Sequence, residues 1–384
     1  MSSRVDASEG GAAAADLERL APIGFDTRRA NNFNTLRLVM ACAVIWSHSF
    51  ALFRGSEDGE PISRLLNGVY NAGNIAVLAF FAISGFLISQ SWCRSSSWKS
   101  YLRKRVSRIL PGYLVATALC SLVVVPLFST RSILDFTSGE WAGLASNLLL
   151  QNYIVQSDAF GGGAVNGSLW SIPYEFWCYL GVLGLGLAGL FKVRAVFPAI
   201  AVIVMLGRVW LDLNGVHPGG GLLERVIGYP YFWFNVLPPF MLGASIYLYR
   251  DVIPRSPLIA LGLGAAVIAA AHLPISHLGQ DIATRLIFPF ALTYAIIFIA
   301  YSRVHLGDAA RFGDFSYGTY LYAFPIQQML HYSVGQSLPF GVLLIVSVAL
   351  SILAGAISWF LVEHWFVGGG AKKRPKLAKP VSSL

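Results

Sequence analysis

The stretch NTLRLVMACAVIWSHSFALFRG, residues 34–55, decides the fold, because it is apolar over a length that can cross a bilayer. A helix of about 20 mostly apolar residues spans the hydrocarbon core of a membrane. The same stretch carries Arg37 near one end and His48 well inside it. Ionisable side chains are costly in hydrocarbon, so within a span they mark a functional site by default.

Composition extends this pattern to the whole chain of 384 residues, which is 55% hydrophobic and only 12% charged. A soluble domain has about 25% charged residues. Apolar segments of roughly 18–25 residues recur along the chain, each long enough to span a membrane as a helix. We therefore predict an all-α, polytopic transmembrane helical bundle of about ten spans. The predicted spans are 36–53, 73–91, 109–128, 168–190, 194–213, 231–249, 257–272, 284–302, 315–333 and 341–363.

Three parts of the chain follow from these spans. Residues 1–30 lack the arginine-flanked apolar core of a signal peptide, so we predict a polar cytosolic N-terminal tail. Residues 31–366 form the transmembrane domain, and residues 367–384 form a basic cytosolic C-terminal tail. The segment 142–155 (AGLASNLLLQNYIV) is apolar but short, which favours a re-entrant or interfacial piece.

Lysine and arginine are unevenly divided between the connections. Every second connection is basic, and the strongest is 92–108, while the loops 54–72 and 129–167 are richer in acidic residues. The positive-inside rule then places both termini in the cytoplasm and the 129–167 loop outside, in a multi-pass protein of the plasma (inner) membrane. The net charge of +9 is explained by this placement, so we expect membrane lipids and no nucleic acid as partners.

The four cysteines do not indicate a metal site. Three of them lie inside apolar segments, and the sequence has no CxxC and no Cys/His spacing typical of zinc. We expect structural thiols and no metal.

Arg37 and His48 share one helix face. His48 lies eleven positions after Arg37, with ten residues between them, which is about 16 Å along a helix and about three full turns. Arg37 then lies near the cytosolic surface and His48 beyond the middle of the membrane. The alternatives are an arginine that extends to the interface from the helix end, and a histidine hydrogen-bonded within the packing.

Glu175 is the second ionisable residue predicted inside a span, in NGSLWSIPYEFWCYL (166–180). This helix enters from outside near Ser168, so Glu175 lies about 10 Å below the outer surface. His48 lies at about the same depth, and a carboxylate next to an imidazole orients the ring and tunes it as a general base. The alternative is a buried glutamate satisfied by Trp, Tyr or Ser neighbours.

The connection WKSYLRKRVSRILPGYL (98–114) concentrates positive charge. Arg105 and Arg108 lie on one face if the segment is helical, with Arg103 and Lys104 beside them. Arginine offers paired donors to phosphate oxygens, so this is a candidate cytosolic phosphate site. The alternative is an orientation signal alone. Glu363, near the same surface, is expected to form a structural ion pair with one of these arginines.

Several of these blocks together resemble the membrane acyltransferase 3 family over about residues 30–366. Arg37 and His48 resemble its R-x10-H signature. The other matching blocks, in order, are AFFAISGFLIS (79–89), LRKRVSRILPGYL (102–114), SLWSIPYEFWCYL (168–180), FGDFSYGTYLYAFPIQ (312–327) and FLVEHWF (360–366). Any one block is weak, but the ordered set is specific. The chain ends soon after its last predicted span, so the resemblance is to members without a fused SGNH domain.

The resemblance implies an O-acyltransferase that moves an acyl group, usually acetyl from acetyl-CoA, to a carbohydrate hydroxyl. The phosphates of acetyl-CoA would bind Arg103, Arg105 and Arg108, and Arg37 would lie at the mouth of the cavity. His48, oriented by Glu175, would take the proton of an acceptor hydroxyl. The acceptor would be a carbohydrate or lipid-linked carbohydrate, such as an exopolysaccharide or O-antigen. An acyl-histidine intermediate and direct transfer both remain open.

Two other classes of protein could also carry these residues. A transporter or flippase of a lipid-linked sugar could use Arg37, His48 and Glu175 as substrate or proton-coupling groups. The sequence shows no inverted repeat, and its arginine cluster falls in a single connection, which disfavours a transporter. A membrane scaffold would leave the buried His and Glu unexplained.

Overall fold

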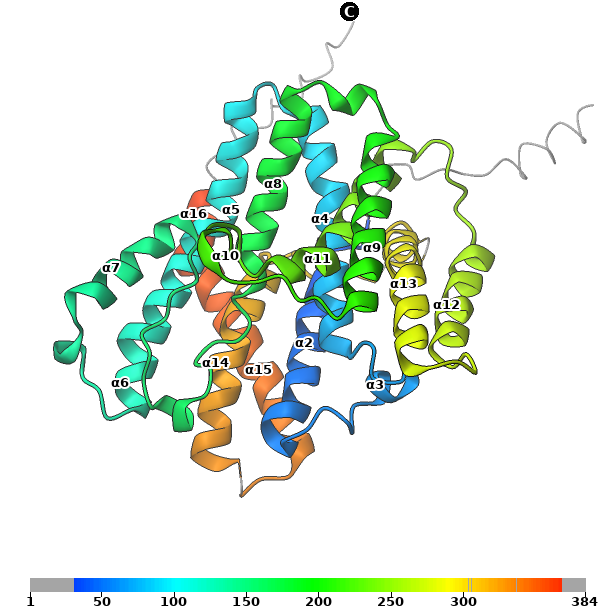
Figure 1. The fold of residues 1–384 in the computed structure, drawn as a ribbon. Helices are drawn as coiled ribbons and strands as arrows, with labels where there is room; N and C mark the ends of the chain where they lie inside the picture. Colours follow the sequence, from blue (N-terminus) through cyan, green and yellow to red (C-terminus); the bar gives the residue numbers. More distant parts are fainter. Residues whose placement is uncertain (1–30, 303, 305, 336, 368–384) are drawn as a thin grey trace, which may run out of the picture.

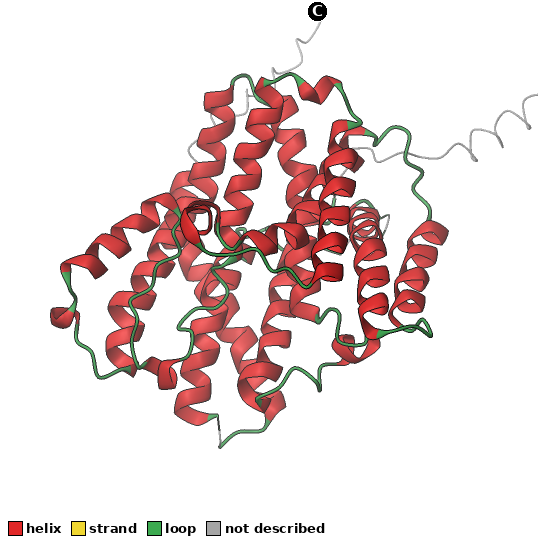
Figure 2. Ribbon diagram, in the orientation of Figure 1, coloured by secondary structure: helices red, strands yellow, loops and turns green. Residues whose placement is uncertain are grey.

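A computed structural model describes residues 31–302, 304, 306–335 and 337–367 (Figure 1). Within these ranges the chain forms helices, turns and loops and no strand (Figure 2), which confirms the predicted all-α class. The two predicted tails lie outside the described residues, apart from Val367.

A long helix occupies each of the predicted ranges. These helices are α2 (Phe33–Arg54), α4 (Ala72–Arg94), α5 (Trp98–Leu119), α8 (Ser171–Leu187), α9 (Val196–Asn214), α11 (Pro230–Leu248), α12 (Pro257–Ala271), α13 (His277–Ala300), α14 (Ser316–Val334) and α15 (Phe340–Ser358). Short helices join them: α3 (Pro61–Leu65), α6 (Val125–Phe128), α7 (Ser138–Ser146), α10 (Gly221–Ile227) and α16 (His364–Val367).

Length and composition qualify 6 helical stretches of the described chain as membrane spans. They are Phe33–Arg54, Ala72–Arg94, Trp98–Phe128, Val196–Asn214, His277–Ala300 and Phe340–Val367. The remaining long helices of the bundle, α8, α11, α12 and α14, are shorter or more polar than these. For example, α12 has 15 residues and α8 has 17. A multi-pass helical bundle is therefore confirmed, whereas the number of about ten spans and the cytoplasmic termini stay predictions.

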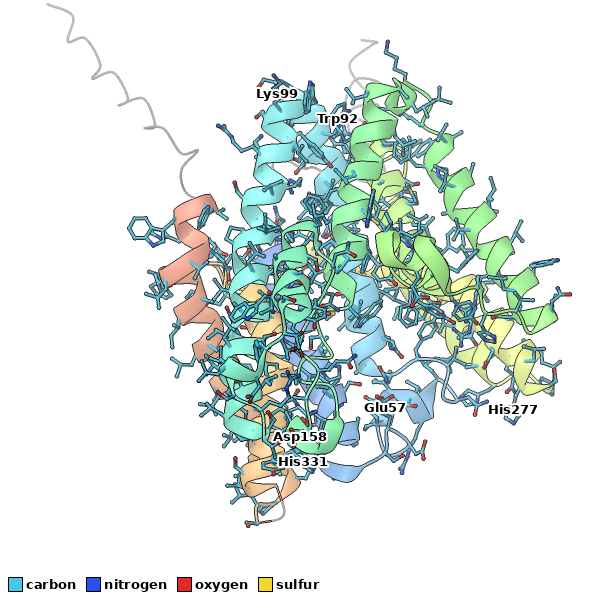
Figure 3. All side chains as sticks on the ribbon, turned by 60° about the vertical axis from the view of Figure 1, so that its left-hand side comes forward. Glu57, Trp92, Lys99, Asp158, His277 and His331 are labelled. Atoms are coloured by element: carbon cyan, nitrogen blue, oxygen red, sulfur yellow. The ribbon has the colours of Figure 1, made fainter. Side chains whose placement is uncertain are left out.

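The bundle has two distinct ends. Trp92 and Lys99 lie at one end, and Glu57, Asp158, His277 and His331 lie at the other (Figure 3). We call the first the basic end, because it carries the connection 92–108, and the second the acidic end. The alternation of loop charge along the sequence thus corresponds to opposite ends of the structure.

Helix α4 is the centre of the bundle and packs against α2, α8, α11 and α13. Its closest approach is to α11, where a side chain at Gly85 would collide with the backbone carbonyl of Phe240. Small residues allow this close packing between helices in membranes. Helices α14 and α15 pack against α2 on the other side.

The basic connection is helical, because α5 begins at Trp98 with the Ser97 hydroxyl accepting a hydrogen bond from the Ser100 backbone N–H. Its arginines therefore stand on the first turns of α5, on the same helix as the following span. α5 continues toward the acidic end through a π-helical turn, Cys120–Val124, into α6. A similar π-helical turn, Trp359–Glu363, joins α15 to α16.

The apolar segment 142–155 forms the end of α7, a 3₁₀ turn and a stretch without regular secondary structure. Figure 1 shows α7 projecting from the side of the bundle. Arg131 holds it there through Glu140, with 2.6 Å between Nη1 and Oε1. Its predicted interfacial position stays a prediction.

Candidate active site

A cavity of about 790 Å³ opens between α2, α4, α5, α8, α14 and α16. This volume falls within the range of small-molecule and cofactor sites, about 300–1,000 Å³. Five of the predicted site residues line it: Arg37, Arg103, Arg105, Arg108 and Glu175. The sixth, His48, does not.

The cavity changes from basic to apolar along its length. Its mouth, toward the basic end, is lined by Ser100, Arg103 and Lys104 of the first turns of α5. Helix α4 runs toward the basic end, so the deepest of its lining residues are Val77 and Phe80. The cavity therefore suits a ligand with an anionic end and a short apolar end.

Two arginines of the cavity share one carboxylate. Asp314 Oδ2 lies 2.7 Å from Arg108 Nη2 and 3.7 Å from Arg37 Nη1. Its other oxygen accepts a hydrogen bond from the Ser316 hydroxyl at 2.6 Å. Burial alone would raise the pKa of the Asp314 carboxyl, but the charges of Arg108 and Arg37 outweigh it and hold that pKa below its usual value.

Asp314 is not among the site residues predicted from the sequence. Its position gave a signal, because it is an acidic residue directly before the predicted span 315–333, on a side otherwise rich in arginine. Its partners are 206 residues away on α5 and further still on α2, so spacing could not reveal them.

Arg105 lies between two tyrosine rings. Its guanidinium carbon is 5.9 Å from the ring centroid of Tyr101 and 5.8 Å from that of Tyr179. Its Nη2 donates to the Ser91 hydroxyl at 3.4 Å, while its Nε is buried without a partner among the described residues.

Glu175 accepts two short hydrogen bonds. The hydroxyls of Ser84 and Tyr179 both donate to Oε1 at 2.5 Å. In this structure the Glu175 carboxylate is therefore satisfied by neighbouring Ser and Tyr hydroxyls, as in the alternative given from the sequence. Within the described chain no hydrogen bond joins Glu175 to His48, so their predicted meeting is not present in this structure.

His48 lies beyond the inner end of the cavity. Its ring meets that of Phe324 edge to face, with centroids 5.1 Å apart, and Nδ1 is buried with no partner that the structure describes. Phe324 is one helical turn nearer the acidic end than Tyr320, which lines the cavity. About 6 Å along α14 therefore separates the level of His48 from the cavity's inner end.

Helix α14 is hydrogen-bonded to α2 just before and just after His48. Gln327 of α14 donates to the carbonyl of Ile45 at 2.9 Å and to the hydroxyl of Ser49 at 2.8 Å, one on each side of His48 along α2. This holds the imidazole ring at a fixed height against α14.

Glu363 differs from its prediction. Its carboxylate accepts a hydrogen bond from the Ser358 hydroxyl at 2.7 Å and forms no ion pair with any residue that the structure describes. Arg108, one of the arginines predicted as its partner, pairs with Asp314 instead. The remaining oxygen of Glu363 is buried without a partner among the described residues.

The described ranges hold no group of three or more His, Cys, Asp or Glu side chains that could bind a metal ion.

The helices and the cavity define a multi-pass membrane protein with a deep binding site that is basic at its mouth and apolar at its inner end. A family model described as an acyltransferase domain, that of acyltransferase 3, matches residues 31–359, so the chain belongs to the acyltransferase 3 family.

Curated relatives agree with this assignment. The chain is 30% identical to an O-acetyl transferase of Shigella phage Sf6, over 91% of this chain and 99% of the relative. It is 26% identical to nodulation protein 10 of Rhizobium leguminosarum bv. viciae, over 87% of this chain and 92% of the relative. It is 23% identical to acyltransferase MdmB of Streptomyces mycarofaciens, over 89% and 91%. No solved structure matches the chain.

The protein is therefore an O-acyltransferase, which decides between the enzyme and the transporter or scaffold considered from the sequence.

Proposed function

We propose that this enzyme transfers an acyl group, foremost acetyl, from cytosolic acyl-CoA to a hydroxyl of a cell-surface or lipid-linked carbohydrate in the plasma membrane. The cavity carries this proposal. A CoA thioester has phosphates at one end and a short acyl group at the other, and the cavity has arginines at one end and apolar side chains at the other.

The phosphate end of the donor fits the first turns of α5. Arg103, Arg105 and Arg108 line the cavity there, and guanidinium groups bind phosphate oxygens through paired, charge-assisted hydrogen bonds. Arg37, held by Asp314, lies beside the path that the pantetheine arm would take.

The acyl transfer itself is assigned to His48. Its imidazole takes the proton of the acceptor hydroxyl as the oxygen attacks the thioester carbon. The C–S bond breaks, and the proton passes to the departing CoA sulfur. His48 lies between the inner end of the cavity and the acidic end, so the donor would approach it from one side and the acceptor from the other. Because about 6 Å along α14 separates His48 from the cavity in this structure, transfer requires the side chains at the inner end to move apart.

Glu175 takes part in the donor-bound state. In this structure its carboxylate is held by Ser84 and Tyr179. It lines the cavity along which the thioester would pass. To reach His48 it would have to release those hydrogen bonds and the two helices would have to shift, because His48 contacts Phe324 on the other side of Tyr320. Its role as the group that orients His48 stays part of the proposal.

The carbohydrate acceptor is supported by one relative. The Shigella phage protein is named as an O-acetyl transferase, which means that its acceptor atom is a hydroxyl oxygen. Carbohydrates offer many such hydroxyls, and a site nearer the acidic end, predicted to face outward, suits a carbohydrate destined for the cell surface.

Membranes that contain the protein, incubated with acetyl-CoA labelled in its acetyl group, test the proposal. We expect label in a polysaccharide or lipid-linked fraction, and none with His48→Ala at equal protein level. His331→Ala, which removes an exposed histidine of α14 at the acidic end, is the matched control and should transfer normally. Near-normal transfer by His48→Ala would contradict the role of this residue. Movement of unlabelled acceptor across the membrane with no acetylation would support the transporter.

A further inference from the structure

The inner end of the cavity is closed by apolar and aromatic side chains. Val77 and Phe80 of α4, Ile172 of α8 and Tyr320 of α14 lie there, each the deepest or near-deepest lining residue of its helix. Phe80 and Tyr320 meet across this end with ring centroids 5.8 Å apart, edge to face. We call this pair the end wall.

The end wall is firmly held. The Tyr320 hydroxyl donates to the backbone carbonyl of Ser168 at 2.6 Å and lies 2.8 Å from the hydroxyl of Ser171. These bonds hold the Tyr320 ring between α14 and the start of α8, where the residue is only 5% exposed. Phe80 packs against the ring held in this way, so the two rings close the inner end of the cavity in this structure.

We propose that Phe80 and Tyr320 limit the length of the acyl group that the enzyme transfers, and so restrict the donor to short acyl-CoA thioesters such as acetyl-CoA. This inference rests on the proposed function, because it takes the cavity as the donor site. The arginines of α5 would fix the phosphate end of the donor, so the distance from them to the end wall is set by the fold.

A longer acyl chain would meet this wall. Each added methylene would press on the two rings or hold the thioester carbonyl further from His48, which lies about one turn past Tyr320. One methylene in a shaped apolar pocket changes the specificity constant by about 10- to 200-fold. Butyryl has two methylenes more than acetyl, so the end wall can account for a strong preference for acetyl donors.

Phe80 is the better of the two residues to change, because Tyr320 also holds the Ser168–Ser171 segment. Leu87 supplies a matched control. It lies seven residues, or about two turns, nearer the basic end on the same face of α4, and it lines the same cavity. Truncating Leu87 widens the cavity where the proposal places the arm of the donor and not its acyl group.

The experiment compares initial transfer rates from acetyl-CoA and butyryl-CoA in membranes that carry the wild type, Phe80→Ala, Phe80→Leu or Leu87→Ala. We expect the ratio of butyryl to acetyl transfer to rise by about 10-fold or more in Phe80→Ala. It should rise less in Phe80→Leu and stay unchanged in Leu87→Ala. If Phe80→Ala does not accumulate, the milder Phe80→Leu gives the answer.

An unchanged ratio in the Phe80 variants, with acetyl transfer retained, would overturn the inference. So would an equal rise in Leu87→Ala, because that would mean general loosening of the cavity. A wild type that transfers neither acyl group from CoA is a different result, since it would overturn the proposed function itself.

Discussion

The Asp314 carboxylate lies against two guanidinium groups from helices that are far apart in the sequence. All three side chains are mostly buried, so none of them is well solvated without the others. Removing one member of a buried ion pair costs about 3–5 kcal/mol, because a charge is left uncompensated. Asp314 therefore matters for stability and for the positions of Arg37 and Arg108.

We predict that Asp314→Asn destabilises the protein by about 3 kcal/mol in thermal unfolding in detergent. Because the folded pKa of Asp314 is lowered, the ion pairs stabilise fully above the ordinary value of about 3.9 and are lost as the pH falls through the lowered pKa. Asp251→Asn breaks a pair whose carboxylate is 68% exposed, and should cost under about 1 kcal/mol. Equal stability of the two variants would contradict this account.

Arg105 and Arg108 make a second prediction at the scale of single residues. Replacing either with alanine removes charge-assisted hydrogen bonds to phosphate, so we expect the KM for acetyl-CoA to rise by about 10- to 100-fold. Arg311→Ala removes an exposed arginine outside the cavity and should leave KM unchanged. A dependence on acetyl-CoA that is equal in all variants would rule out the α5 arginines as the phosphate site.

Helix packing gives a prediction for α4 and α11. A methyl group at Gly85 would collide with the Phe240 carbonyl, which is backbone and cannot turn aside. We expect Gly85→Ala to lower stability by at least 1–3 kcal/mol, about the cost of overpacking a core. Gly181→Ala in α8 meets no atom within 4 Å and should be neutral or stabilising. Stable Gly85→Ala protein would show that α4 and α11 are less closely packed.

The elements themselves could largely be predicted from the sequence. Apolar runs of sufficient length gave a helix in every predicted range, because a span must satisfy its own backbone hydrogen bonds. The start of α5 was harder to see, since its first turns are too basic to look like a span. Only the structure shows that the arginines stand on the helix and face the cavity.

The site was harder to predict than the elements. Position along a helix follows from residue number, and the structure has Arg37 in the second turn of α2 with His48 three turns further along the same helix. Their depths in the membrane stay predictions. The direction in which a side chain points around the bundle does not follow from residue number. Glu175 is predicted at the depth of His48, but in the structure it lies one turn on the basic side of Ser171, which bonds Tyr320. His48 instead contacts Phe324, one turn on the acidic side of Tyr320. Equal depth is therefore wrong, and the Glu175 carboxylate is hydrogen-bonded to Ser84 and Tyr179.

At the scale of the whole molecule, the two ends of the bundle are predicted to face opposite sides of the membrane. Cys93 is exposed near the basic end, and Asp158 lies at the acidic end (Figure 3). In intact cells, a thiol reagent that cannot cross membranes should label Asp158→Cys but not Cys93. Permeabilised cells should label both. Labelling of Cys93 in intact cells would reverse the orientation.

The central claim is that the cavity holds acyl-CoA with its phosphates at the α5 arginines. An experimental structure of the protein with bound CoA tests it most directly. We predict density for the phosphates within hydrogen-bond distance of Arg105 and Arg108, with the sulfur end directed toward Phe80 and Tyr320. CoA bound elsewhere, or bound with its sulfur end at the mouth, would contradict the account.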